Sequence, residues 1–463
     1  MSILFADAWL ITMNERREVL ERASVCVEKD RIVAVGTRKD LDRRFPAAEV
    51  VDCNGRIVMP GMVNTHTHLF QTLMKGLGDD MVLKNWFTCM TGPSGVHLTP
   101  ADAHAAAMHG CVESIRSGVT TLVDFMYVHT RPGMIKAVVE AFDETGMRGF
   151  VCRGFISLGE EYGVPRELIE KPEHAIGDAR KQMRRYNKPG ARIQVGVAPN
   201  MIWAVDEKGY RLTRTLADEE HALITTHLAE TTFELETAKT RYGQTDTEFL
   251  SEIGFLGPDV LAAHCVHCKP HDIRILKHHD TKVAHNPCSN LYLASGCPPI
   301  PEMLMAGVTV GLASDGPASS NNHSLFQAMK FAALMQKGFH QDATILTAEK
   351  VMELATIDGA RAVGLEKEIG SIEVGKKADL VVIDFNNPFM TPIHHPVSAI
   401  VYSALGNEVT TVMIDGQFVM RDGVVSRVNE AAVRKQAQVH ADDLARRSGS
   451  EKFKKRPWRS MAI

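Results

Sequence analysis

Short apolar runs alternate with longer amphipathic segments through the middle of the chain. The segments 100–118 and 347–364 show helical spacing, and Thr347 and Gly364 suit the N-cap and C-cap of the second helix. Eight apolar runs predict β-strands, at residues 56–66, 119–125, 148–155, 191–199, 222–227, 260–265, 282–286 and 308–315. Eight strand–helix units over about 300 residues predict an α/β chain with a (β/α)8 barrel. A doubly wound open sheet is the alternative, but the Gly-rich phosphate turn that it often carries is absent from the sequence.

Both ends of the chain are rich in short strands. The first strands precede residue 57, beginning with the apolar stretch MSILFADAWLITMNE, and strand patterns return at 370–385 and 409–425. The flanking segments therefore predict one small β-domain built from both ends. We expect the chain to divide into a composite β-sandwich from 1–57 and 366–425, a barrel from 58–365, and a helical or tail segment from 426–463.

Composition and charge exclude several classes of protein. The 463 residues are 44% hydrophobic and 23% charged, and the formal net charge is −4, so nothing favours nucleic acid or an anionic membrane as partner. No run approaches the roughly 18 apolar residues of a membrane helix. The nine scattered cysteines do not suggest a disulfide framework, and we expect a cytoplasmic enzyme. The basic segment RRSGSEKFKKRPWRS is interpreted as a solvated tail or subunit contact.

The predicted barrel strands end in residues that bind metals and move protons. They are His66 and His68 after the first strand, His227 with Glu230 after the fifth, His264 after the sixth, His285 on the seventh and Asp315 after the eighth. Because barrel enzymes place their chemistry at the carboxyl ends of the strands, these side chains are expected to meet.

Three imidazoles and one carboxylate suit a single divalent ion, most readily Zn²⁺, with Fe²⁺ as the alternative. An open coordination position lowers the pKa of bound water towards about 7 and makes hydroxide available at neutral pH. Glu230 then suits a proton shuttle, Asp315 suits the acceptor of the water proton, and His264 suits polarisation of the atom under attack.

Several motifs together resemble the amidohydrolase superfamily. They are His-x-His after the first strand, HLAET, AHCVH, VAHNPCSN, SDGPASSNN and the carboxy-terminal ATIDGARAVGLEKEIGSIEVGKKADLVVID. The resemblance is to the branch of cytosine, guanine and adenosine deaminases. ATIDGAR, EIGSIE and GNEVTTVMIDG are most similar to s-triazine hydrolases of the melamine deaminase and atrazine chlorohydrolase types. S-adenosylhomocysteine and 8-oxoguanine deaminases are also similar.

The resemblance implies a distorted (β/α)8 TIM barrel with a β-sandwich, and dimers or higher homo-oligomers. It also assigns the roles of site residues: metal ligands at His66, His68, His227 and Asp315, a proton shuttle at Glu230 and an electrophilic histidine at His264. Binuclear members carry a carboxylated lysine at the end of the fourth strand. Here that strand ends VAPNM, so we expect one metal ion in each subunit.

The leading hypothesis is a metal-dependent aminohydrolase of an amino-substituted nitrogen heterocycle, a triazine, pyrimidine or purine base. Hydroxide attacks the ring carbon and ammonia leaves, so the enzyme acts on C–N bonds other than peptide bonds. The same hydroxide can instead displace chloride or an alkylamine from a triazine. A non-catalytic assembly protein that retains the fold is the alternative from another class, and it predicts missing ligands.

Five further residues are candidates for binding the substrate, each beside a structural role. Trp86 can cover a flat ring or anchor its loop, and Asp124 can bind a ring substituent or cap a helix. Nucleoside-deaminating relatives often have APHAPY where this chain has APNMIW, so Asn200 replaces a substrate-contacting histidine and argues against an adenosyl substrate. His285 and Asn290 can contact the ring, or serve packing and turn formation.

Overall fold

A barrel of parallel strands forms the centre of the computed structural model, which describes residues 2–455 and 458. Within these residues its eight strands are β6 (Met62–Thr67), β7 (Val119–Met126), β8 (Arg148–Phe155), β9 (Ile193–Pro199), β10 (Ile224–Leu228), β11 (Val260–His264), β12 (Lys282–His285) and β13 (Val310–Leu312). Each strand pairs with the next in chain order. The predicted barrel is confirmed, although the predicted strand 56–66 divides, because β5 (Arg56–Pro60) pairs in a second sheet.

The barrel closes through side-chain and loop contacts between its first and last strands. Thr65 Oγ1 donates to Leu312 O at 3.0 Å, and Asp315 N donates to His66 O at 3.1 Å. No strand ladder joins β13 to β6 within the described residues. This departure from regular pairing is the distortion of the barrel, and it lies where two predicted metal ligands approach each other.

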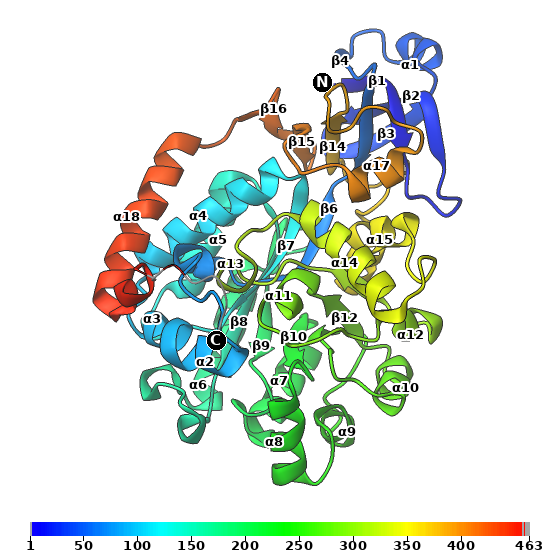
Figure 1. Ribbon diagram of the computed structural model, residues 1–463. Helices are drawn as coiled ribbons and strands as arrows, with labels where there is room; N and C mark the ends of the chain where they lie inside the picture. The colour runs from blue at the N-terminus through cyan, green and yellow to red at the C-terminus, as the bar shows by residue number, and fades with distance from the viewer. Residues whose placement is uncertain (1, 456–457, 459–463) are drawn as a thin grey trace.

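Helices follow the strands and cover the outside of the barrel (Figure 1). The principal ones are α4 (Pro100–Arg116), α5 (Met134–Thr145), α6 (Pro172–Tyr186), α7 (Glu207–Glu220), α8 (Thr232–Tyr242), α9 (Asp246–Glu252), α10 (Pro270–His278) and α14 (Leu325–His340). Short helices α2 (Leu83–Trp86), α11 (Pro287–Tyr292), α12 (Ile300–Met305) and α13 (Pro317–Ser320) lie in the connecting loops.

The predicted helix 347–364 forms two helices, α15 (Ala348–Ala355) and α16 (Ile357–Ala362). Thr347 caps α15 as predicted, since its side chain accepts from Lys350 N. Thr356 breaks the helix because its backbone, at φ −126° and ψ −95°, is not helical. Gly364 lies one residue beyond the C-cap of α16 with a φ of +71°, a left-handed conformation that glycine adopts without cost.

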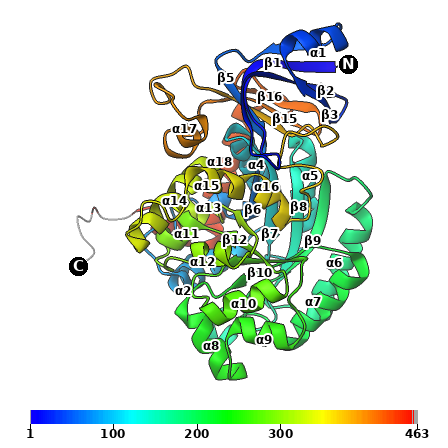
Figure 2. The same cartoon turned by 90° about the vertical axis from the view of Figure 1, so that its right-hand side faces the viewer.

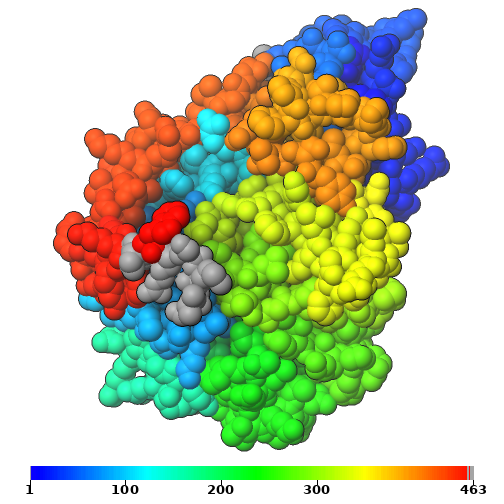
Figure 3. All heavy atoms as spheres, in the orientation of Figure 1, coloured from blue at the N-terminus to red at the C-terminus, as the bar shows by residue number. Residues whose placement is uncertain are grey.

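The second sheet is built from both ends of the chain, as predicted. It contains β1 (Ser2–Ile11), β2 (Val19–Glu28), β3 (Arg31–Gly36), β4 (Glu49–Asp52) and β5, with β14 (Leu380–Asp384), β15 (Val409–Ile414), β16 (Gln417–Arg421) and β17 (Val424–Val425). Figure 2 shows the blue and orange strands side by side at one end of the molecule, and the same segments project together in Figure 3. The sheet encloses its own core, where Phe5, Val58 and Met413 pack together.

A buried ion network joins the second sheet to the barrel. Arg148 at the start of β8 donates through Nε to Asp379 Oδ2 at 2.6 Å and through Nη2 to Asp379 Oδ1 at 3.1 Å. The same Nη2 donates to Asp415 Oδ1 at 3.0 Å. Bidentate pairing of this kind fixes both distance and orientation, so it holds the two parts in register.

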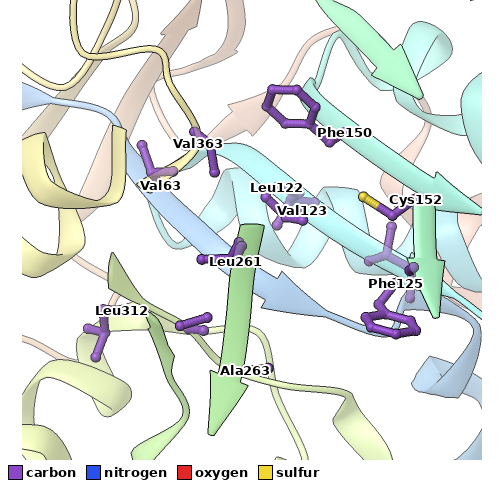
Figure 4. Packing of buried hydrophobic residues seen from close by; sticks show 14 of the residues in the cluster. Val63, Leu122, Val123, Phe125, Phe150, Cys152, Leu261, Ala263, Leu312 and Val363 are labelled. Atoms are coloured by element: carbon purple, nitrogen blue, oxygen red, sulfur yellow. The ribbon is translucent and has the colours of Figure 1, made fainter. Parts of the chain in front are cut away.

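Apolar side chains of the barrel strands belong to one buried core, including Val63, Leu122, Phe125, Leu261 and Leu312 (Figure 4). They support the strand ends that carry the candidate site residues, because close packing leaves the backbone little freedom.

The expected carboxy-terminal helix is α18 (Glu430–Ser448), and it packs on α4. His440 Nδ1 and Arg447 Nη2 each lie 2.7 Å from a carboxylate oxygen of Asp102. Residues 456–457 and 459–463 of the basic tail lie outside the described residues, and the domain boundaries expected from the sequence stay predictions. No helix of the described residues has the length and apolar character to cross a membrane.

Candidate metal centre and active site

Four residues expected to bind a metal meet at one end of the barrel. His66 and His68 come from β6, His227 comes from β10, and Asp315 follows β13. His68 Nε2 lies 3.2 Å from His227 Nε2 and 3.4 Å from Asp315 Oδ1, and His66 Nε2 also lies 3.4 Å from Asp315 Oδ1. All four side chains are buried. The structure therefore brings together groups that lie more than two hundred residues apart in the sequence.

The proton positions on two of the histidines follow from their other ring nitrogens. His68 Nδ1 lies 2.7 Å from Phe125 O, and His227 Nδ1 lies 2.9 Å from Asn200 O. Because a carbonyl oxygen only accepts, each Nδ1 must carry the hydrogen, and each neutral ring then has a lone pair on Nε2. Two lone pairs facing each other at 3.2 Å repel unless a cation binds both.

The charges at this cluster also suit a cation. Burial lowers the pKa of His66, and burial together with His66 lowers the pKa of His68 to about 3, so the imidazoles are neutral. Burial alone would raise the pKa of Asp315, but the surrounding histidines hold it well below its usual value, and the carboxylate is anionic. Neutral imidazoles and a carboxylate are the forms that ligate zinc and ferrous iron.

The two carboxylate oxygens of Asp315 have different surroundings: Oδ2 accepts hydrogen bonds, and Oδ1 faces the histidines. Ser289 Oγ and Ser319 Oγ donate to Oδ2 at 2.5 and 2.8 Å. Oδ1, facing His66 and His68, has no hydrogen-bond partner among the described residues, and neither ring nitrogen of His66 has one. Buried polar atoms without partners are costly, so the cluster fits a bound divalent ion.

Glu230 and His264 lie beside this cluster as an acid–base pair. Glu230 Oε2 is 3.6 Å from His264 Nε2, and Ser295 Oγ donates to Glu230 Oε1 at 3.2 Å. Burial, with the nearby charge of Asp315, raises the pKa of Glu230 to about 8. His264 Nδ1 donates to Asn290 Oδ1 at 2.9 Å, and burial lowers the pKa of His264. At neutral pH the proton of this pair therefore resides on Glu230.

The backbone around these groups is held in uncommon conformations. Ala229, His264 and Asp315 have φ values of +49°, +74° and +59°, in the left-handed region that side chains other than glycine rarely adopt. Glu234 Oε2 accepts from Glu230 N at 2.6 Å, and an oxygen of Asp246 accepts from Ala229 N at 2.8 Å. Strain that the surroundings hold in place is typical of active sites.

A small inner chamber of about 20 Å³ opens above the cluster. It is lined by His68, Gln71, Leu83, Trp86, Phe87, Tyr127, Asn200, Met201, Trp203, His227, Glu230, Leu293 and Asp315. Two predicted substrate residues, Trp86 and Asn200, belong to this lining. Trp86 is fixed by its indole N–H, which donates to Ala318 O at 2.9 Å, and Asn200 also orients His227.

The other predicted substrate residues lie behind the ligands. Asp124 Oδ1 accepts from Leu69 N at 2.7 Å, directly after His68, and burial raises the pKa of Asp124 to about 7. Asn290 bonds to His264, and His285 is fully buried. None of the three belongs to the lining of the inner chamber, and Asp124 and Asn290 instead bond to Leu69 N and to His264. Their role as substrate contacts stays a prediction.

The inner chamber is also lined by residues that the sequence did not single out: Gln71, Leu83, Tyr127, Met201, Trp203 and Leu293. Gln71 and Tyr127 follow the first two barrel strands within a few residues, where barrel loops supply site residues. Trp203 stands in the APNMIW segment already marked as a departure. The sequence shows only that some of these residues follow a barrel strand. That position does not distinguish a side chain that lines the chamber from one that packs in the core.

The chain matches a known protein family over most of its length. The profile described as the amidohydrolase family matches residues 57–419. The chain belongs to the amidohydrolase family. A 5-methylthioadenosine/S-adenosylhomocysteine deaminase of Acetivibrio thermocellus is 35% identical over 434 residues, which covers 94% of this chain and 97% of the relative. A 5'-deoxyadenosine deaminase of Methanothermobacter thermautotrophicus is 38% identical over 430 residues, covering 92% and 95%.

Solved structures agree with this placement of the amidohydrolase. A zinc-bound adenosine deaminase of Xanthomonas campestris superposes with a TM-score of 0.90 at 28% identity, covering 96% of this chain and 98% of the other. The zinc complex of atrazine chlorohydrolase from Arthrobacter aurescens has a TM-score of 0.88 at 22% identity, covering 95% and 100%. The second likeness shows the common fold alone, so a triazine substrate is not supported by it.

Proposed function

We propose that this amidohydrolase is a zinc-dependent hydrolytic deaminase of a purine nucleoside of the adenosine type. The reaction class, hydrolytic deamination at a metal centre, agrees with the family and with the names of its relatives. The observation that carries the proposal is the buried pair of facing imidazole lone pairs, His68 Nε2 and His227 Nε2, 3.2 Å apart. A protonated acid, Glu230, lies next to this pair and shares its chamber.

The metal site is assigned to His66, His68, His227 and Asp315. Zinc is preferred because it accepts both imidazole and carboxylate ligands and holds an open position in catalytic sites. A divalent ion held there supplies a Lewis acid that makes water acidic enough to act as a nucleophile at neutral pH. Fe²⁺ accepts the same donors, so metal analysis of the purified protein decides between the two.

The protein's own residues manage the protons of the reaction. Glu230, protonated at neutral pH, donates to the ring nitrogen beside the carbon that carries the amino group. Asp315 Oδ1, which lacks a hydrogen-bond donor among the described residues, accepts the proton that the attacking water loses. His264 Nε2 lies 3.6 Å from Glu230 Oε2, and His264 Nδ1 donates to Asn290. The neutral ring then carries a lone pair on Nε2, so we assign His264 the orientation of the attacking water in place of the polarising role expected from the sequence. The proton held by Asp315 passes to the amino group as the C–N bond breaks and ammonia leaves, and the proton of the added hydroxyl returns to Glu230 as the ring carbonyl forms.

The adenosine-type substrate is supported by relatives of 35% and 38% identity that span nearly their whole length. The sequence departure at Asn200 argued against such a substrate. In the structure, however, Asn200 accepts from His227 Nδ1 through both its carbonyl oxygen and its Oδ1. Asn200 therefore orients His227, a proposed metal ligand, and an asparagine at this position does not exclude a nucleoside substrate.

An ammonia-release assay tests the proposal. The zinc-loaded protein is assayed with adenosine, 5'-deoxyadenosine and 5'-methylthioadenosine. Melamine, cytosine and an alkylamino-chlorotriazine are assayed separately as substrates of the alternative classes. Deamination of the adenine nucleosides with the highest kcat/KM supports the proposal. Faster ammonia, alkylamine or chloride release from the triazines would overturn the substrate assignment. Loss of every activity in the fully loaded protein would favour the non-catalytic alternative.

Two further expectations accompany this function. We propose that the protein works in the cytoplasm as a homo-oligomer on a small heterocyclic substrate, without nucleic acid or membrane partners. Light scattering coupled to size-exclusion chromatography measures the oligomeric state, and a monomer at micromolar concentration would contradict it.

A further inference from the structure

A second, larger chamber lies outside the inner one. Its volume is about 370 Å³, within the range of small-molecule sites. Leu83, Trp203 and Leu293 line both chambers, so the two chambers adjoin across these three side chains. A ligand whose ring lies in the inner chamber beside Glu230 therefore has the outer chamber next to it.

Aromatic side chains form one wall of the outer chamber. The rings of Tyr162 and Phe233 have centroids 5.2 Å apart, and those of Trp203 and Phe233 are 5.9 Å apart, both in edge-to-face contact. Trp203 follows β9 and Phe233 lies at the start of α8, so loops after different strands hold the wall (Figure 1). Mutually packed rings are rigid and present apolar surface to a ligand.

Trp203 carries a second indication of a ligand. Its indole Nε1 is buried without a hydrogen-bond partner among the described residues, and the whole side chain is only 4% exposed. The indole N–H is a donor and never an acceptor. Trp203 lines both chambers, so a bound ligand with an acceptor next to the indole would satisfy this donor.

The charge of the outer chamber is one-sided. Lys84 is the one formally charged side chain among the described residues that line it, and no carboxylate belongs to that lining. Lys84 Nζ lies 5.0 Å from the ring centroid of Phe233, and no carboxylate of the described residues pairs with it. His267 is neutral, because burial lowers its pKa. Hydroxyls of Thr88, Thr231 and Ser295 supply the remaining polarity.

We propose that the outer chamber binds an apolar substituent of the heterocycle, one without positive charge, and thereby selects substituted nucleosides over the free base. The inference rests on the proposed function, since it concerns the part of the substrate that lies away from the reacting carbon. Tyr162, Trp203 and Phe233 contact the apolar part of the substituent, and Lys84 disfavours a cationic one.

Three adenine compounds of graded substitution test the inference on the zinc-loaded protein. 5'-Methylthioadenosine carries a neutral apolar group, 5'-amino-5'-deoxyadenosine carries a cation at neutral pH, and adenine carries no substituent. We expect kcat/KM for the methylthio compound to exceed that for the amino compound by about fivefold. It should exceed that for adenine by about tenfold or more.

Variants of the chamber separate its contribution from general effects. Lys84→Glu should reverse the preference between neutral and cationic compounds, and Phe233→Leu should reduce the advantage of the methylthio compound over adenine. The matched controls are Lys330→Glu and Phe339→Leu, exposed positions on α14 that should leave both ratios unchanged. Lys84 is exposed, so its variant is expected to fold and keeps the test decisive.

Two failures can be told apart. The inference is overturned, and the proposed function stands, if adenine nucleosides are deaminated but Lys84→Glu keeps the parent preference between the methylthio and amino compounds. The same holds if Phe233→Leu keeps the parent ratio between the methylthio compound and adenine. If no adenine compound is deaminated, the proposed function is overturned and the inference falls with it.

Discussion

Replacement of Glu230 by glutamine removes the acidic proton of the carboxyl group and keeps the size of the side chain. The carboxyl has a pKa of about 8, so at pH 7 its protonated form exceeds the ionised form by about ten to one. Glutamine keeps the size of the side chain and an oxygen for Ser295, but it has no acidic proton. A positioned general acid contributes about 10²–10⁴ in rate, so kcat should fall by that factor, equivalent to about 3–5 kcal/mol.

The assay follows ammonia release by Glu230→Gln and by its matched control Glu236→Gln, an exposed residue on α8, the helix that follows Glu230. A raised carboxyl pKa means that the acid is present below about pH 8 and lost above it, so parent activity should fall through that pH. The control should keep both the rate and this limb, and Glu230→Gln should lose the limb while keeping its metal. Parent-like turnover by Glu230→Gln, or loss of its metal, would refute the role as proton donor.

Three other substitutions test the supporting structure. Asp124→Asn should remove a pH dependence of the unfolding free energy. Folding raises the pKa of Asp124 from 3.8 to about 7, so the parent protein loses up to about 4 kcal/mol of stability as the pH rises through that interval. Urea unfolding of both proteins at pH 4 and pH 8 measures this difference. Ser289→Ala removes a donor to Asp315 and should weaken metal binding about 10–100-fold in a chelator competition, whereas an unchanged affinity would deny that support. Arg148→Met leaves Asp379 buried without its cation and should cost about 3–5 kcal/mol in urea unfolding, and a loss under 1 kcal/mol would show that the pair is dispensable.

The barrel could be predicted from the sequence because its strands are buried and apolar, and each is followed by a helical segment. The break at Thr356 could not, since the pattern of apolar residues continues across it and only the tertiary contacts decide where the chain turns. The division of residues 56–66 between two sheets was hidden for the same reason. Both parts are apolar, and the pattern does not say which partner a strand chooses.

The cluster of proposed metal ligands could also be predicted, because histidines at the ends of apolar strands are uncommon and a parallel barrel brings such ends together. The substrate residues could not be separated from their supports. Asp124 and Asn290 stand at strand ends and in loops like the ligands, yet each is engaged with a backbone or a ligand. Whether a polar side chain faces the chamber or the shell behind it depends on side-chain direction, which spacing along the chain does not specify.

Metal content measured together with activity tests the central claim most directly. The account predicts about one zinc ion per chain, loss of adenine nucleoside deamination when a chelator removes it, and return of activity when zinc is added. His227→Asn should lower both metal content and activity, because it removes one of the two imidazoles whose Nε2 atoms face the proposed metal position. Well under one metal ion per chain in the active protein, or full activity after complete metal removal, would contradict the account.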